Sequence, residues 1–101
     1  MTEFAFHPAV IRIPARRPVT LVLVNDGQLA HQFETAYLRT VGTRVVSAAL
    51  LVDSVGLEVA RLNPGASARL EFVPLRRGRV AFACTIEGHK EAGMTGVLEV
   101  R

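Results

Sequence analysis

The chain contains one cysteine, no tryptophan and one tyrosine in 101 residues. A lone cysteine excludes an internal disulfide, so the sequence carries no disulfide marker of an oxidising compartment. Because only 21% of the residues are charged and 50% are hydrophobic, the composition excludes a disordered chain and predicts a large buried core. Aromatic residues are scarce, so valine, leucine, isoleucine and alanine must fill most of that core, and the β-branched members of this set favour strands.

A long hydrophobic run is also missing. The longest apolar stretch, residues 45–52, is interrupted by Ser47 and stops at Asp53, so it is too short to span a membrane. The start of the chain lacks the basic segment and apolar core of a secretory signal peptide. We therefore expect no membrane span. If the protein is exported, we expect its signal to have been removed, or the domain to come from a longer chain.

A dense basic stripe is likewise absent, although the formal net charge is +3. The positive residues are spread from Arg12 to Arg101, and a nucleic-acid-binding surface would concentrate them, so we do not expect a nucleic-acid partner. The pairs 16–17 and 76–77 are arginines beside turn signals. We interpret them as solvated turn residues, with contact to an acidic partner as the alternative.

Short strands separated by turn residues are what the sequence contains instead. The run 19–24 is nearly all apolar, which predicts a central strand ended by the turn residues 25–27. Other segments alternate apolar and polar residues with a period of two or begin and end at turn signals. They are residues 10–13, 31–34, 57–62, 67–73, 79–84 and 95–100. This pattern predicts an all-β sandwich or barrel forming one domain over residues 1–101.

The segment 35–56 is the part of the chain with the weakest pattern. Within it, Val45, Ala48, Ala49 and Val52 recur at helical spacing between two glycines. We therefore expect one short helix over residues 43–55.

The most informative pattern lies near the end of the chain, where Cys84, His89 and Met94 are separated by four residues each. A thiolate, an imidazole and a thioether from one loop form a soft ligand set that suits copper better than magnesium, calcium or a structural zinc. His31 follows a strand and a turn, and strand pairing could bring it to the loop as a second imidazole. Two imidazoles, a thiolate and a weak axial methionine make the trigonal site of a blue-copper electron carrier.

The segment 79–100 also resembles the closing strand, ligand loop and last strand of the cupredoxins, the small blue-copper proteins. The resemblance is weaker over residues 19–31 and around the turn 63–65. It implies a Greek-key β-sandwich and a type 1 copper site that transfers one electron at a time. Carried over by position, His31 and His89 bind through ring nitrogens, Cys84 as thiolate and Met94 axially.

The resemblance also implies how the protein works with others. Redox partners are expected to dock near His89 on an apolar patch that includes Ala92, Gly93 and Met94, with residues 90–91 at its rim. The protein is expected to be a monomer located in the periplasm or elsewhere outside the cytoplasm. Many family members carry asparagine after the first histidine, where it ties the two ligand segments together, whereas this chain has Gln32.

Other interpretations stay open at this level. A lone cysteine at a strand end is often a buried, unreactive thiol, and His7 competes with His31 as the fourth ligand. The chain could also sequester or deliver copper without redox turnover, although its two methionines and three histidines are few for that task. We do not expect an enzyme, because four protein ligands leave no open metal position for a substrate.

Overall fold

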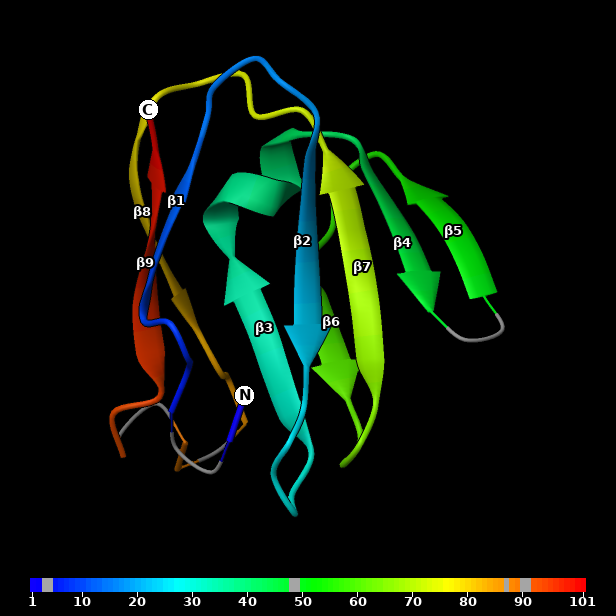
Figure 1. Cartoon of the computed structure of the whole chain (residues 1–101), viewed down its shortest axis with the longest axis vertical. Coiled ribbons are helices and arrows are strands. Elements are labelled where there is room, and N and C mark those ends of the chain that lie inside the picture. The colour runs from blue at the N-terminus through cyan, green and yellow to red at the C-terminus, as the bar shows by residue number, and fades with distance from the viewer. Residues whose placement is uncertain (3–4, 48–49, 87, 90–91) are drawn as a thin grey trace.

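The computed structural model describes residues 1–2, 5–47, 50–86, 88–89 and 92–101, and its strands form two sheets that face each other (Figure 1). The five-stranded sheet has the order β1 (Val10–Ile13), β9 (Thr95–Val100), β8 (Gly78–Ala83), β3 (His31–Thr35), β6 (Val59–Leu62). The four-stranded sheet has the order β2 (Val19–Val24), β7 (Ser67–Phe72), β4 (Thr43–Ser47), β5 (Leu50–Ser54). The expected all-β sandwich is therefore confirmed.

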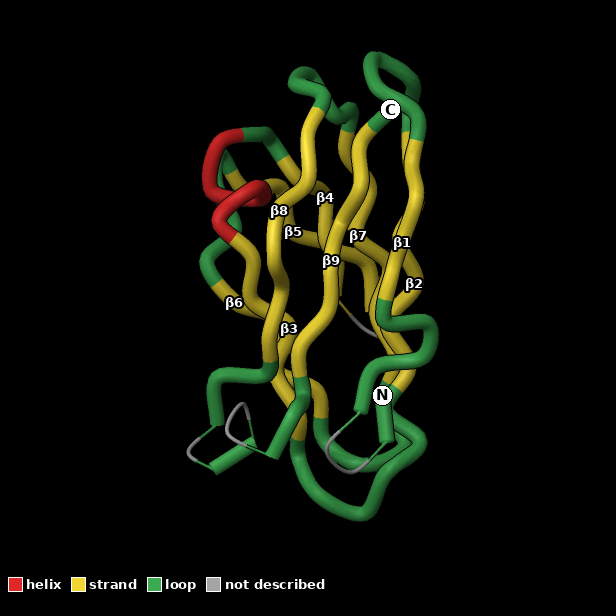
Figure 2. The backbone as a smooth tube through the Cα atoms, turned by 90° about the vertical axis from the view of Figure 1, so that its left-hand side faces the viewer, coloured by secondary structure: helices red, strands yellow, loops and turns green. Residues whose placement is uncertain are grey.

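The connections between strands are those of a Greek-key sandwich. The pairs β4–β5 and β8–β9 each stay within one sheet, and the other connections cross from one sheet to the other. Strand β1 pairs in parallel with β9, and the remaining pairs of neighbouring strands are antiparallel. The segment between β2 and β3, which crosses between the sheets, and the segment between β8 and β9, which does not, lie at the same end of the sandwich (Figure 1 and Figure 2).

Three phenylalanines form the centre of the core on the five-stranded side. The ring of Phe82 lies 4.9 Å from that of Phe6, nearly perpendicular to it, and 5.0 Å from that of Phe33. Phe33 and Phe82 are each 1% exposed, and Leu70 of the opposite sheet is fully buried. Edge-to-face ring pairs of this kind add to the stability that burial alone provides. Cys84, which follows Phe82 by two residues, is itself a fully buried member of this core.

Strand β2 departs from expectation, because it lies at the edge of its sheet and not at the centre. It pairs with β7 along one side, from Val19 opposite Phe72 to Val24 opposite Ser67. Val22 is 56% exposed on the outer face. An apolar run marks a strand that can be buried on both faces, but position in a sheet depends on which other strands the fold supplies as neighbours.

The helix predicted over residues 43–55 is wrong: the described residues of this segment form the antiparallel strands β4 and β5. Val45 pairs with Leu70 of β7, and the guanidinium of Arg44 donates to Asp53 across the hairpin at 2.9 Å. Ala48 and Ala49, which supported the helical spacing, lie outside the described residues. The β-branched Thr43 and Val45 favour strands, and pairing with β7 outweighs a short helical periodicity.

Helical structure among the described residues is limited to the 3₁₀ helix η1 (Ala36–Thr40). The hydroxyl of Thr35 accepts from the backbone N–H of Tyr37 at its start. In the described part of the chain, no helix has the length and apolar character needed to cross a membrane.

Candidate metal centre

The antiparallel pairing of β3 with β8 explains why residues distant in sequence meet at one end of the sheet. His31 is the first residue of β3, and Cys84 directly follows the last residue of β8. In an antiparallel pair the start of one strand lies beside the end of the other. The pairing of Thr35 with Phe82 and of Glu34 with Ala83 therefore brings His31 towards Cys84.

The segment between β8 and β9 is folded back by backbone hydrogen bonds. The amide of Cys84 donates to the carbonyl of Met94 at 3.1 Å, and the amide of Met94 donates to the carbonyl of His89 at 3.1 Å. Gly88 and Gly93 have φ of 84° and 97°, a region that side chains with a Cβ rarely adopt. The two glycines next to the ligand candidates are therefore needed for the turns that place His89 and Met94.

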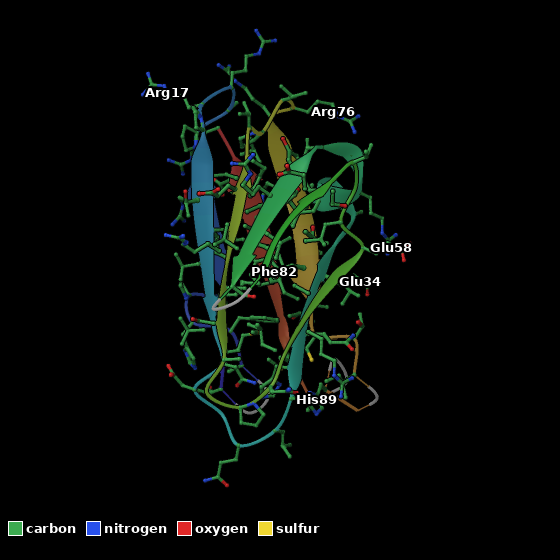
Figure 3. All side chains as sticks on the ribbon, turned by 90° about the vertical axis from the view of Figure 1, so that its right-hand side faces the viewer. Arg17, Glu34, Glu58, Arg76, Phe82 and His89 are labelled. Carbon is green, nitrogen blue, oxygen red and sulfur yellow. The ribbon has the colours of Figure 1, made fainter. Side chains whose placement is uncertain are left out.

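The structure brings three of the four predicted ligands together as one buried cluster. One potential ligand atom from each of His31, Cys84 and His89 lies within 4.8 Å of the other two. The sulfur of Cys84 is 3.3 Å from Nδ1 of His89, and the two imidazole rings are 5.1 Å apart. His31 and Cys84 are fully buried and His89 is 7% exposed at the lower end of the sandwich (Figure 3).

These residues fit a bound metal ion by both chemistry and spacing. Bonds from a first-row metal ion to imidazole nitrogen and thiolate sulfur are about 2.0–2.3 Å long, so donors on one ion lie up to about 4.6 Å apart. The three donors of the cluster approach that spacing in the folded chain. Their softness favours copper or zinc over magnesium or calcium.

Met94 lies beside the cluster, immediately before β9. Its side chain is fully buried, and its carbonyl accepts from the amide of Cys84. This backbone hydrogen bond therefore fixes Met94 next to Cys84. His7, the competitor of His31, is exposed and hydrogen-bonds to the hydroxyl of Thr2 at 3.1 Å, and it is not a member of the cluster. Lys90 and Glu91, expected at the rim of a docking patch, lie outside the described residues.

Gln32 joins the two ligand segments, a link that the sequence did not predict because the family resemblance implies asparagine at this position. Its side-chain amide donates to the hydroxyl of Thr85 at 2.8 Å, and its backbone N–H donates to the sulfur of Cys84 at 3.3 Å. The guanidinium of Arg61 donates to the side-chain oxygen of Gln32 at 3.3 Å. Glutamine is one methylene longer than asparagine, and its longer side chain still reaches the segment that holds the cysteine.

Asn25 is a second supporting residue that the sequence marked only as part of a turn. It is fully buried, and its side-chain amide donates to the carbonyls of Leu29 and Leu62 at 2.9 Å each. Its side-chain oxygen accepts from the amide of Gly27 at 2.9 Å. Since Leu62 pairs with His31, Asn25 fixes the segment that leads to the first histidine.

Replacing Asn25 with alanine is expected to lower the free energy of unfolding by about 2 kcal/mol, because buried carbonyl and amide groups lose their partner. Denaturant unfolding followed by circular dichroism measures the change. Asn63→Ala, at an exposed turn, is the matched control and should change stability by less than about 0.5 kcal/mol. Equal losses in the two variants would contradict a supporting function for Asn25.

The His-Cys-His cluster lies apart from a large hollow of the described surface. That hollow, of about 670 Å³, is lined by residues such as Thr20, Arg44, Asp53 and Glu71 on the outside of the four-stranded sheet and includes no member of the cluster. The cluster itself is buried at the end of the sandwich, with His31 and Cys84 fully covered and His89 slightly exposed.

Comparison with known proteins places this geometry in a family. The model of the cupredoxin-like domain matches residues 1–98. The copper-resistant cuproprotein CopI of Rubrivivax gelatinosus is 30% identical over 98 residues, which cover 95% of this chain and 59% of that protein. The protein of the same name from Pseudomonas aeruginosa is 28% identical over 130 residues, covering 98% of this chain and 72% of its own length.

A solved structure supports the same assignment. Auracyanin B is 27% identical and superimposes with a TM-score of 0.69, covering 99% of this chain and 82% of its own. The chain spans about three fifths of the length of the Rubrivivax gelatinosus relative. With a family model that matches nearly the whole sequence, a sandwich of the same fold and a buried His-Cys-His cluster at its end, the chain belongs to the cupredoxin-like domain family.

Proposed function

We propose that the chain is a type 1 copper protein that carries single electrons between redox proteins. His31, Cys84 and His89 would form the trigonal ligand set, and Met94 would be the weak axial ligand. The residues 1–101 would act as one domain. A bound copper ion would supply the one-electron couple between Cu(I) and Cu(II).

The observation that supports this proposal best is the assembly of the cluster by the fold itself. His31 is fixed in the sheet between β6 and β8, while Cys84, His89 and Met94 are fixed by backbone hydrogen bonds around the following turn. Ligands that are fixed from two sides keep nearly the same geometry when the charge of the bound ion changes. Small reorganisation favours fast electron transfer over tight storage of one oxidation state.

The surroundings of the sulfur support a tuned redox site. The backbone N–H of Gln32 donates to the sulfur of Cys84, which draws electron density from the thiolate. Hydrogen bonds to a ligating sulfur raise the reduction potential. Burial of Cys84 keeps water from the sulfur and thereby protects it from oxidation.

The end of the sandwich around His89 would be the docking surface for redox partners. Ala92 and Gly93 are exposed there, and Leu29, in the neighbouring segment, is 47% exposed. An apolar surface next to a slightly exposed ligand gives a partner close access to the site. We further propose that the protein works as a monomer outside the cytoplasm and catalyses no reaction of its own, since four protein ligands close the metal.

Copper handling without redox turnover is the second candidate. The observation in its favour is that both relatives described above are named copper-resistant cuproproteins. A protein of this kind would bind the ion for storage or delivery, and its ligands would have to release the ion to an acceptor.

Repeated reduction and reoxidation of the copper-loaded protein distinguishes the two candidates. A carrier is expected to keep its visible absorption and its copper through many cycles, because the four ligands bind both oxidation states. Copper content after desalting and the spectrum after each cycle are the measurements. Rapid transfer of Cu(I) to an added chelating acceptor, with loss of the spectrum, would favour copper handling and contradict the carrier proposal.

A further inference from the structure

The end of the sandwich opposite the cluster carries four arginines, which we call the arginine end: Arg16, Arg17, Arg76 and Arg77. The first two lie in the turn between β1 and β2, and the other two lie between β7 and β8. Arg16, Arg76 and Arg77 line one surface hollow together with Leu75. Figure 3 shows Arg17 and Arg76 at the end of the long axis opposite His89, and this axis measures 35 Å.

The charge of the arginine end is not neutralised within the described part of the chain. None of its four guanidinium groups takes part in the ion pairs of the described side chains. The nearby strand pair shows the contrast: Glu99 is within 2.6–3.8 Å of Arg101, Arg79 and Arg12. The hydrogen bond from Arg101, with the charges of the other two, holds the pKa of Glu99 below its usual value.

Hydrogen bonds fix the backbone of the arginine end, so its four side chains project from a fixed framework. The amide of Arg16 donates to the carbonyl of Pro74 at 2.6 Å, which joins the two turns. The hydroxyl of Tyr37, which is 7% exposed, donates to the carbonyl of Arg76 at 2.7 Å and lies 3.0 Å from its amide, which donates to it. A fixed backbone limits the entropy lost on binding an anion to that of the arginine side chains.

Arg16 also has φ of 62°, a conformation that favours glycine. The surrounding turn holds this residue in the strained region although glycine would fit there without strain. Backbone strain that is kept at an exposed position indicates that the arginine side chain has a function, such as binding a partner. Its guanidinium adds to the charge of the neighbouring turn.

Exposed apolar side chains lie near Arg76 and Arg77 in the chain and at the same end of the sandwich as all four arginines. Leu75 is 59% exposed and Val73 is 41% exposed, and both follow β7 at this same end. Surfaces that combine basic residues with exposed apolar side chains suit the boundary between lipid headgroups and acyl chains. Arginine matches phosphate groups with two parallel hydrogen bonds.

We propose that the arginine end docks the protein reversibly on an anionic phospholipid surface, with the phosphate headgroups bound by the four guanidinium groups and Leu75 inserted between them. Docking at this end leaves the His89 end turned away from the lipid. A redox partner is a poorer occupant, because the arginine end lies at the far end of the molecule from the cluster. An acidic protein serving only as an anchor is an alternative that the experiment tests.

Sedimentation of the copper-loaded protein with lipid vesicles tests the proposal. We expect binding to phosphatidylcholine vesicles that contain phosphatidylglycerol, release by added salt, and little binding to phosphatidylcholine alone. The variant R76Q/R77Q is expected to bind about 30-fold more weakly, since each basic residue at an anionic surface contributes about five-fold. R44Q/R69Q removes the same charge from the four-stranded sheet and should bind within about three-fold of the parent chain.

A third variant separates binding from folding. Arg16→Gly relieves the positive φ and is expected to raise the unfolding midpoint by about 4 °C, while it weakens vesicle binding about five-fold. Equal binding to neutral and anionic vesicles, equal losses in the two double variants, or binding to polyglutamate without binding to vesicles would each overturn the proposal. The visible spectrum should be the same in all variants, so failure here is distinguishable from failure of the electron-carrier function.

Discussion

If the proposed type 1 site is correct, replacing Cys84 with serine is expected to abolish the intense visible absorption that such a site gives the copper-loaded protein and to weaken copper binding more than about 100-fold. The absorption arises from charge transfer between thiolate and copper, and a serine hydroxyl is a poor metal ligand at neutral pH. Loss of a residue that merely orients a ligand already costs about 10- to 100-fold in affinity, so loss of a ligand should cost more. Titration with Cu(II), followed by visible spectroscopy and copper analysis, measures both effects.

His7→Ala provides the matched control for this experiment. His7 is exposed, lies outside the cluster and bonds to Thr2, so its removal should leave both the spectrum and the affinity unchanged. The Cys84→Ser protein should remain folded, because the change removes one buried sulfur and keeps a polar atom of similar position. A visible band that survives in Cys84→Ser, or that disappears in His7→Ala, would refute the proposed ligand set.

Gly96→Ala is expected to destabilise the fold by at least about 3 kcal/mol. Gly96 pairs with Phe82 across β8 and β9, and a Cβ at this position would lie 2.2 Å from Cζ and 2.4 Å from Cε1 of the Phe82 ring. It would also lie 2.5 Å from the carbonyl oxygen of Ala9. Non-bonded carbon atoms do not approach this closely, so either the ring or the backbone before β1 must move.

The Phe82 ring has little freedom to move, because it packs against Phe6 and Phe33 in the centre of the core. The expected loss corresponds to a fall of the unfolding midpoint by about 12 °C or more for a domain of this size. Thermal unfolding by circular dichroism gives the value. Copper retention should also decrease, since Phe82 precedes Cys84 by two residues and displacement of the strand reaches the thiol.

Gly65→Ala separates this clash from the general cost of replacing glycine. Gly65 has φ of 79°, and no atom lies within 4 Å of the position that an alanine Cβ would take, so alanine there suffers only backbone strain. That strain is about 1 kcal/mol. If Gly96→Ala and Gly65→Ala lower the free energy of unfolding equally, the close packing of Phe82 over Gly96 is not the cause of the loss in Gly96→Ala.

Three of the candidate ligands could be predicted because residues of the right chemistry lie a few positions apart in the sequence. Cys84, His89 and Met94 belong to one loop, and the glycines before His89 and Met94 mark the turns it requires. His31 was harder to predict, since its approach depends on the pairing of β3 with β8. Pairing between distant segments leaves no local signal in the sequence. Only the position of His31 after a predicted strand and turn indicated that it could be a ligand.

Gln32 and Asn25, the two residues that support the ligand segments, could not be recognised from the sequence. Gln32 stands where the family resemblance implied an asparagine, and the reach of its side chain to Thr85 depends on the separation of two segments in space. Asn25 looked like an ordinary turn residue, and its hydrogen bond to Leu62 joins positions 37 residues apart. Both act through contacts that a linear pattern does not contain.

The amino-acid pattern alone was enough to predict the all-β class, the positions of most strands and the ligand candidates Cys84, His89 and Met94, because these depend on alternation, turn residues and local spacing. Three features required the folded chain: β2 lies at an edge, residues 43–47 and 50–54 form strands and not a helix, and four arginines from two turns lie together opposite the cluster. Those features depend on which segments become neighbours. Neighbours are selected by burial and strand pairing over the whole domain, and no single segment encodes them.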